Sequence, residues 1–205
     1  MQLVCLDLEG VLVPEIWMAV AEKTGVEALR RTTRDEPDYD VLMRYRLDLL
    51  ARHRITLPQI QEVIGTLAPL EGAAAFLEWL RSVTQVVILS DTFAEFAQPL
   101  MRQLSWPTLL CHSLEVQANG AITGYRLRQP DPKLKAVRAF QSLNLRVLAA
   151  GDSYNDLSML LSADAAVLFR PPDSLAAEQP QLPVTRTHAQ LREALATILN
   201  GNAPA

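Results

Sequence analysis

The sequence predicts an α/β fold in which helices cover both faces of a doubly wound parallel sheet. Short apolar runs alternate with longer amphipathic runs, as expected for parallel strands joined by crossover helices. Three of the short runs end in acidic residues, a pattern typical of a ligand site beyond the carboxyl ends of the strands. Residues 14–70 break the alternation because they contain no good strand, which indicates a helical insertion after the first strand.

Short apolar runs bounded by charged or turn-forming residues predict the strands. We expect strands at residues 3–8, 86–91, 146–152 and 165–169. Residues 114–127 alternate around Asn119-Gly120, a dipeptide that favours a hairpin turn.

Apolar residues spaced three and four apart predict the helices of the core. Thr92, Asp131 and Thr187 are expected as helix caps, and Pro132 suits a first helical turn. The expected helices span residues 72–82, 92–104, 131–143, 154–163 and 187–199.

The insertion is predicted to be a small helical cap. Residues 14–25, 39–53 and 57–67 have helical patterns, and a charged loop, TTRDEPD, follows the first of them. We therefore divide the chain into an α/β core, residues 1–13 and 71–205, and a cap, residues 14–70.

The composition limits the class of protein. The 205 residues are 49% hydrophobic and carry a net charge of −4, which argues against a general nucleic-acid binder. Neither a membrane-spanning run of about 20 apolar residues nor a leader pattern is present, so we expect a cytoplasmic protein. The two cysteines lack metal-binding spacing and are expected to be reduced packing residues.

Polar side chains follow three of the predicted strands. Because parallel strands end at the same edge of a sheet, these side chains are expected to cluster there. Clustered carboxylates require a hard cation such as Mg²⁺, and a lysine at the start of a helix can offset further charge. The residues are Asp7 and Glu9, Ser90 and Asp91, Asp152, Asn155 and Asp156, and the lysine Lys133. Each acid alone fits a turn or a helix cap equally well, so the prediction depends on their combination.

In this order, the stretches DLEGVL, ILSD, Lys133 and GDSYND resemble the four motifs of the haloacid dehalogenase-like phosphohydrolase superfamily. The resemblance covers nearly the whole chain and implies a Rossmann-like core. DLEGVLVPE and DPK resemble the phosphoserine phosphatase group, and within it the bifunctional branch that also transfers phosphate to homoserine.

The resemblance implies a role for each motif residue. Asp7 would be the nucleophile and Glu9 the proton shuttle, with Glu9 replacing the commoner aspartate. Mg²⁺ would bind Asp7, the main-chain carbonyl of Glu9, and Asp152. Ser90, Asp91, Lys133 and Asn155 would bind the phosphorylated substrate, and Asp156 would support the metal site from behind.

Arg46 falls within the apolar arc of its predicted helix, where a guanidinium needs an anionic partner. A structural pair with Glu15 or an acid of the charged loop, and a side chain that reaches to solvent, are the alternatives to a ligand role. Glu15 itself could stabilise a helix start. The resemblance implies instead that Arg46 binds the substrate carboxylate and Glu15 the substrate ammonium group.

The remaining candidates are assigned packing or surface roles. We expect His53, His112 and His188 to be surface or packing residues, and Trp17, Trp79 and Trp106 to lie in the core. The hydroxyl of Thr92 could also reach a phosphate.

The predicted function is a Mg²⁺-dependent phosphatase of O-phospho-L-serine, with homoserine as a further acceptor. The alternatives are a phosphatase for another small phosphate ester and a non-catalytic phospho-acceptor module. No nucleotide-binding P-loop pattern is present, which disfavours ATP as the donor. The sequence leaves the oligomeric state open, with a homodimer as one alternative.

Overall fold

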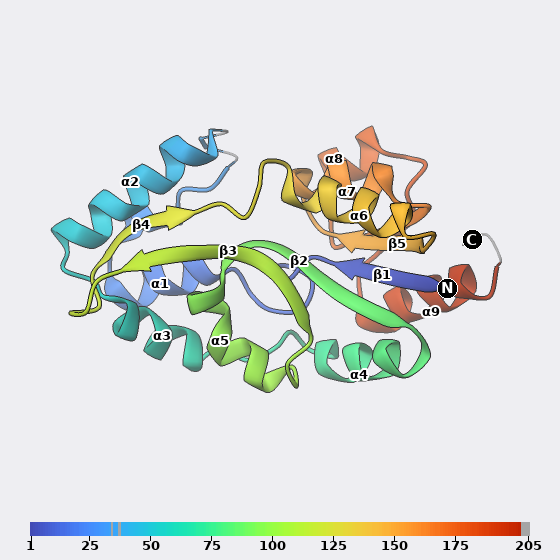
Figure 1. Cartoon of the computed structure of the whole chain (residues 1–205), viewed down its shortest axis with the longest axis horizontal. Coiled ribbons are helices and arrows are strands. Elements are labelled where there is room, and N and C mark those ends of the chain that lie inside the picture. Colours follow the sequence, from blue (N-terminus) through green and yellow to red (C-terminus); the bar gives the residue numbers. More distant parts are fainter. Residues whose placement is uncertain (34, 37, 202–205) are drawn as a thin grey trace.

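The computed structural model describes residues 1–33, 35, 36 and 38–201, and it contains a seven-stranded sheet in the order β4-β3-β2-β1-β5-β6-β7 (Figure 1). All neighbouring strands of this sheet are parallel except β3 and β4, which are antiparallel. The strands are β1 (Gln2–Leu6), β2 (Gln85–Phe93), β3 (Thr108–Val116), β4 (Ile122–Arg126), β5 (Arg146–Gly151), β6 (Ala165–Phe169) and β7 (Val184–Thr185). The predicted α/β class is confirmed.

Helices cover both faces of the sheet, with α6, α7 and α8 on one side and α4, α5 and α9 on the other (Figure 1). The α-helices are α1 (Ile16–Thr24), α2 (Tyr39–Arg52), α3 (Leu57–Gly65), α4 (Ala73–Val83), α5 (Ala94–Gln103), α6 (Pro132–Ser142), α7 (Leu157–Ser162), α8 (Asp173–Glu178) and α9 (His188–Leu199). The turns η1 (Glu27–Arg30) and η2 (Tyr154–Asp156) are 3₁₀-helical.

Alternate residues of β1 serve two separate cores. Val4 and Leu6 are fully buried in the cluster that contains residues of α4, α5 and α9, whereas Leu3 and Cys5 pack in the cluster that contains residues of α6, α7 and α8. This division follows from the two-residue period of a strand. It explains why β1 reads as a continuous apolar run rather than an alternating one.

The central position of β1 aligns the strand ends that carry the acids. Leu6 pairs with Ile88 of β2 on one side and with Ala150 of β5 on the other. The next residue, Asp7, donates its main-chain N–H to Ala150 O at 3.0 Å. The strand order reverses about β1, and this topological switch point is where ligands of open α/β sheets bind.

The segment between β1 and α4 forms the three predicted helices α1, α2 and α3, beyond the carboxyl ends of the central strands (Figure 1). Leu70 N donates to Leu12 O at 2.9 Å and so joins the places where this segment leaves and re-enters the core. Helix α3 packs against α5, and α2 lies beside β4. Arg34 and Pro37 of the charged loop lie outside the described residues.

The hairpin prediction is confirmed, since β3 and β4 pair antiparallel on either side of Asn119-Gly120. Thr187 is confirmed as a helix cap, because its side chain accepts from Gln190 N. Pro132 is confirmed in the first turn of α6.

Four local predictions are wrong. Trp106 was expected in the core, but 58% of its surface is exposed. Thr92 is not a helix cap, because β2 continues through Phe93 and α5 begins only at Ala94. Asp131 stands at the N-cap position of α6, but its φ of 48° is left-handed and its side chain makes no capping bond. Residues 154–156 are 3₁₀-helical rather than α-helical, and the short elements α8 and β7 were not predicted.

Within the described residues, none of the helices has both the length and the apolar character needed to cross a membrane.

Candidate active site

A cavity of about 350 Å³ lies where the carboxyl ends of β1, β2 and β5 face α1 and α2. Most of the predicted site residues line this cavity. They are Asp7, Glu9, Glu15, Arg46, Ser90, Asp91, Lys133, Asp152 and Asn155. The tenth, Asp156, is fully buried beside it.

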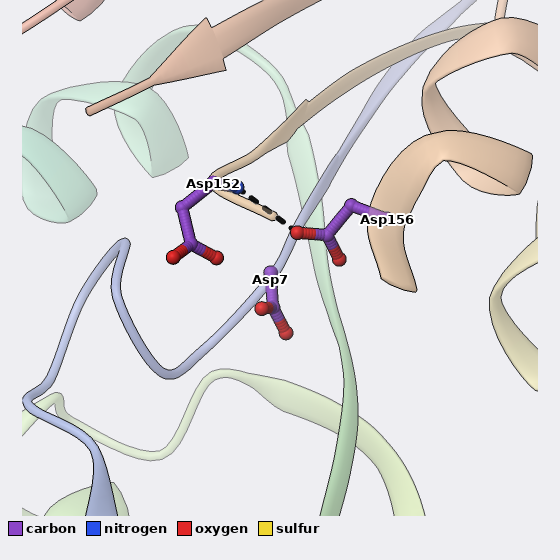
Figure 2. Close-up of side chains that lie close together, drawn as sticks. All are labelled: Asp7, Asp152 and Asp156. Atoms are coloured by element: carbon purple, nitrogen blue, oxygen red, sulfur yellow. Dashed lines mark hydrogen bonds between the residues drawn. The ribbon is translucent and has the colours of Figure 1, made fainter. Parts of the chain in front are cut away.

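Asp7, Asp152 and Asp156 form a cluster of carboxylates in which one oxygen of each lies within 4.8 Å of the others (Figure 2). Asp156 is held from behind, because it accepts the main-chain N–H groups of Asp152 at 2.9 Å and Ser153 at 3.2 Å. Asp7 and Asp152 line the cavity. Hard oxygen donors in this arrangement fit Mg²⁺.

Gly10 is required for this geometry. It has a φ of +78°, and a Cβ at this position would overlap the carboxylate of Asp152. The turn after β1 can therefore approach the end of β5 only because residue 10 lacks a side chain.

Excess negative charge perturbs the acids. Burial and the charge of Asp156 raise the pKa of Asp7 well above its usual range. The same two causes, in the same order, raise the pKa of Asp152 to about 7. A bound cation would relieve this repulsion, which is a second indication of a metal site.

Lys133 is the buried cation of the cluster. Its Nζ lies 2.7 Å from Asp156, 3.0 Å from Asp7 and 3.3 Å from Asp91. Burial alone would lower the pKa of this lysine, but the charges of Asp156 and Asp7 raise it well above the usual value. Lys133 is therefore charged and restrained at the edge of the cavity.

Glu9 occupies the N-terminus of α1. Its Oε2 accepts the main-chain N–H of Ile16 at 2.8 Å, whereas Glu15, at the N-cap position, makes no capping bond. The helix start is thus stabilised by Glu9, although the sequence suggested Glu15. Burial, together with the charge of Glu15, raises the pKa of Glu9 to about 7, a value suited to proton transfer near neutral pH.

Arg46 lines the cavity and is buried, with only 6% of its surface exposed. Its Nη2 donates to Arg31 O at 2.8 Å, and its guanidinium lies 4.5 Å from the ring centre of Trp17. Its buried Nε has no hydrogen-bond partner. Burial lowers the pKa of Arg46 to about 10.

The structure excludes a solvent-exposed Arg46 side chain and a direct ion pair with Glu15, although the charges of Glu9 and Glu15 partly offset the effect of burial on its pKa. The side chain does not reach solvent, and no carboxylate of the described residues lies within 4 Å of it. Trp17 is buried as predicted, but it also lines the cavity beneath this guanidinium.

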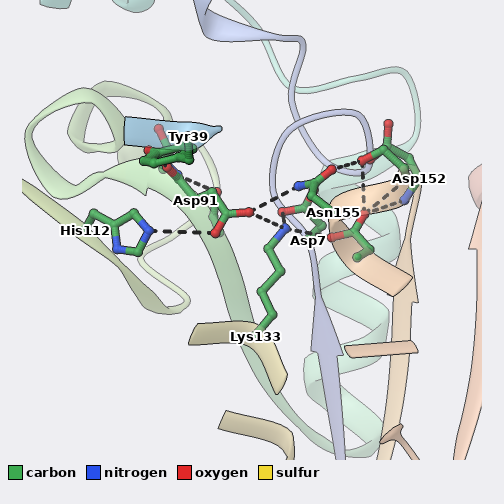
Figure 3. Close-up of polar contacts among 11 residues, drawn as sticks. Asp7, Tyr39, Asp91, His112, Lys133, Asp152 and Asn155 are labelled. Atoms are coloured by element: carbon green, nitrogen blue, oxygen red, sulfur yellow. Dashed lines mark hydrogen bonds and ion pairs between the residues drawn. The ribbon is translucent and has the colours of Figure 1, made fainter. Parts of the chain in front are cut away.

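Asp91 is the centre of a polar network that the sequence did not predict (Figure 3). Its carboxylate lies 3.3 Å from Lys133, accepts from Asn155 Nδ2 at 3.1 Å and lies 3.7 Å from Nε2 of His112. Its main-chain oxygen accepts the hydroxyl of Tyr39 at 3.0 Å. His112 is therefore more than a packing residue. The sequence contains no signal for its contact with Asp91, because that contact joins two neighbouring strands.

Ser90 and Thr92 flank Asp91 and also line the cavity. Thr92 N donates to Ser90 Oγ at 3.2 Å, which restrains the side chain of Ser90 at the end of β2. The side chain of Thr92 also contributes a hydrogen bond to Glu9.

Two relatives are similar to this chain over most of its length. It is 60% identical over 192 residues to the phosphoserine phosphatase ThrH of Pseudomonas aeruginosa, covering 94% of each chain. It is 59% identical over 192 residues to a phosphoserine phosphatase of Pseudomonas syringae pv. tomato, covering 94% of this chain and 81% of the other.

The fold is similar to that of a substrate-bound phosphoserine phosphatase, with a TM-score of 0.77 and 21% identity over 95% of this chain and 97% of the other. Residues 1–164 match the haloacid dehalogenase-like hydrolase family. The chain therefore belongs to the haloacid dehalogenase-like hydrolase family.

Proposed function

We propose that this protein is a Mg²⁺-dependent phosphoserine phosphatase that also transfers phosphate to homoserine. One observation carries the choice of substrate: a buried arginine without a carboxylate partner faces the same cavity as the acid cluster and its lysine. The names of the relatives at 60% and 59% identity support the same substrate.

Asp7 is proposed as the nucleophile. A carboxylate oxygen attacks phosphorus, an aspartyl phosphate forms, and the bond between phosphorus and the serine oxygen breaks. Glu9 gives its proton to that leaving oxygen. It then takes a proton from the next acceptor, water or the homoserine hydroxyl, which releases the phosphoryl group from Asp7.

Asp7, the main-chain carbonyl of Glu9, and Asp152 would hold Mg²⁺, which neutralises phosphoryl charge when bound. Asp156 would keep Asp152 in position through its bond to that residue's main-chain N–H. The donor set fits this ion because it offers oxygen atoms alone.

Ser90, Lys133, Asn155 and the main-chain N–H of Asp91 are proposed to bind the phosphate. All four residues line the cavity, and Lys133 is adjacent to Asp7. Charged donors fixed before the substrate arrives stabilise the phosphoryl group without further reorganisation.

Residues 14–70 are proposed as the cap that selects an amino acid. Arg46 would bind the substrate carboxylate through its planar guanidinium, and Glu15 would bind the ammonium group. Both belong to this segment and both line the cavity. The ring of Trp17, which packs against the guanidinium, would hold that group in a fixed orientation.

The test is to incubate the protein with phosphoserine and Mg²⁺, with and without homoserine, and to follow inorganic phosphate and phosphohomoserine. We expect repeated turnover, and phosphohomoserine when homoserine is present. Turnover of phosphoethanolamine in preference to phosphoserine would favour another small phosphate ester. Phosphorylation of Asp7 without turnover would favour the phospho-acceptor module.

A further inference from the structure

The cavity contains one carboxylate that the proposed chemistry does not use. Among the described residues, five acids and two basic residues line the cavity. Four of these acids have a proposed role for their side chains, in catalysis, in binding the substrate ammonium group or in holding the metal: Asp7, Glu9, Glu15 and Asp152. For Asp91, only the main-chain N–H has a proposed role, which is to bind phosphate. Its side chain places an additional negative charge beside a proposed phosphate site, which opposes the binding of an anion.

This carboxylate occupies the donors that phosphate needs. The ammonium group of Lys133 has three N–H bonds, and it faces Asp156, Asp7 and Asp91, with Asp91 the most distant at 3.3 Å. Asn155 likewise directs its Nδ2 to Asp91 at 3.1 Å (Figure 3). Phosphate can bind both residues only if the contacts with Asp91 weaken.

His112 offers the carboxylate a second partner, on the side away from Lys133 (Figure 3). Nδ1 of His112 accepts the main-chain N–H of Arg128 at 3.1 Å, so the ring proton lies on Nε2. That Nε2 is 3.7 Å from Oδ1 of Asp91, slightly longer than a hydrogen bond. A small movement of the carboxylate toward His112 would complete this bond as the contact with Lys133 is released.

The network holds Asp91 as an anion. Burial alone would raise the pKa of Asp91, but Lys133, with help from His112 and Asn155, holds it well below the usual range. The tie between Tyr39 and the main-chain oxygen of Asp91 fixes the end of β2 against α2, so the side chain rather than the strand is expected to move.

We propose that the Asp91 carboxylate is an internal competitor for the phosphate group, which satisfies Lys133 and Asn155 in the empty site and shifts toward His112 when phosphate binds. This inference rests on the proposed binding of phosphate by Lys133 and Asn155. The consequence is weaker retention of inorganic phosphate, and therefore faster release of the last product. The charged carboxylate repels a phosphate dianion at short range, and phosphate must also replace its contacts with Lys133 and Asn155.

The test measures binding of inorganic phosphate to the whole protein by calorimetry with Mg²⁺ present, beside product inhibition of phosphoserine turnover. Asp91→Asn keeps the shape of the side chain and removes its charge. We expect this variant to bind phosphate about tenfold more tightly. The phosphate concentration that inhibits phosphoserine turnover should fall by the same factor. Unchanged or weaker phosphate binding would overturn the inference and make Asp91 an ordinary positioning residue.

Two substitutions of His112 separate its two contacts. His112→Gln keeps a donor near the Nε2 position, whereas His112→Asn keeps only an acceptor near the Nδ1 position for Arg128. If His112 receives the displaced carboxylate, the asparagine variant binds phosphate several-fold more weakly and the glutamine variant recovers most of the affinity. The reverse order would mean that His112 only fixes the loop at Arg128.

The wild-type protein separates this inference from the proposed function. If it neither binds phosphate nor turns over phosphoserine, the proposed function fails and the inference fails with it. If it does both and Asp91→Asn gains no affinity, only the inference fails.

Discussion

Replacing Arg46 by alanine is expected to change substrate selectivity more than catalysis. One N–H of its guanidinium already donates to Arg31 O, and Nη1 has only the weak acceptor Met43 Sδ at 3.9 Å. Nε has no partner. A guanidinium has five N–H bonds, so at least three remain available to a ligand carboxylate, and a bidentate contact requires two on the same side of the group.

The expected loss of activity follows from the strength of a hydrogen bond to a charged group. A buried hydrogen bond to a charged group contributes ~1.5–3 kcal/mol, which is roughly ten- to a hundredfold in kcat/KM. Arg46→Ala should reduce kcat/KM for phosphoserine by that factor and leave phosphoethanolamine, which has no carboxylate, nearly unchanged. Arg46→Lys should recover only part of the loss, because an ammonium group cannot make the bidentate contact.

The assay compares kcat/KM for the two esters in each variant, with thermal melting as a check of folding. Arg44→Ala is the matched control, since Arg44 is exposed and lies on the same helix. An equal loss on both esters, accompanied by a lower melting temperature, would show that Arg46 supports the fold and does not read the substrate.

Three further changes test the acids. Asp7→Asn should abolish turnover because an amide is a poor nucleophile, and more than a few per cent of the wild-type kcat, with deamidation excluded, would contradict the assignment. Glu9→Gln should lower kcat by about 10²–10⁴-fold with substrate binding retained. A loss explained wholly by weaker Mg²⁺ affinity would instead make Glu9 a metal residue. Gly10→Ala should abolish Mg²⁺-dependent activity, because the new Cβ displaces the Asp152 carboxylate; normal Mg²⁺ affinity in that variant would refute the proposed metal site. Glu9→Gln should also stabilise the metal-free protein above pH 7. The wild-type free energy of unfolding falls as pH rises from the unperturbed pKa of 4.5 to the folded value of about 7, since only the folded state keeps the proton there. The variant lacks this loss, which is up to about 3 kcal/mol. The measurement is the difference in melting temperature between variant and wild type at pH 8 and at pH 4.5. The same difference at both pH values would refute the perturbed pKa.

The sequence predicted the acid cluster because its geometry depends on few variables. Asp7 and Asp152 each follow an apolar run, and adjacent parallel strands bring their carboxyl ends to one edge whatever the details of packing. Burial of Arg46 was predicted for a similar reason, since a helical period fixes which face a residue occupies.

The contacts that the sequence did not reveal depend on register and loop conformation. Asp91 meets His112 only because β2 and β3 pair with a register shift between Leu89 and Phe93. Glu9 reaches Ile16 only because the turn at Gly10 directs the chain back toward β1. Neither depends on a residue pattern, so composition and periodicity carry no information about them.

Within the part of the chain that the structure describes, buried groups with unsatisfied charge or hydrogen-bonding capacity gather at the cavity, and the signs of their charges are informative. Burial raises the pKa values of Asp7, Glu9 and Asp152, and neighbouring carboxylates raise them further, whereas Arg46 is a buried cation with an unpaired N–H. Folding alone would favour removing each of these groups, since buried charges without partners are costly. A divalent cation at the acids, with a carboxylate at Arg46, would satisfy both ends of the cavity at once. The proposed substrate has that carboxylate at one end and, at the other, a phosphate that Mg²⁺ and Lys133 could bind together. The unsatisfied charges of the cavity are therefore complementary to Mg²⁺ and phosphoserine combined rather than to either alone.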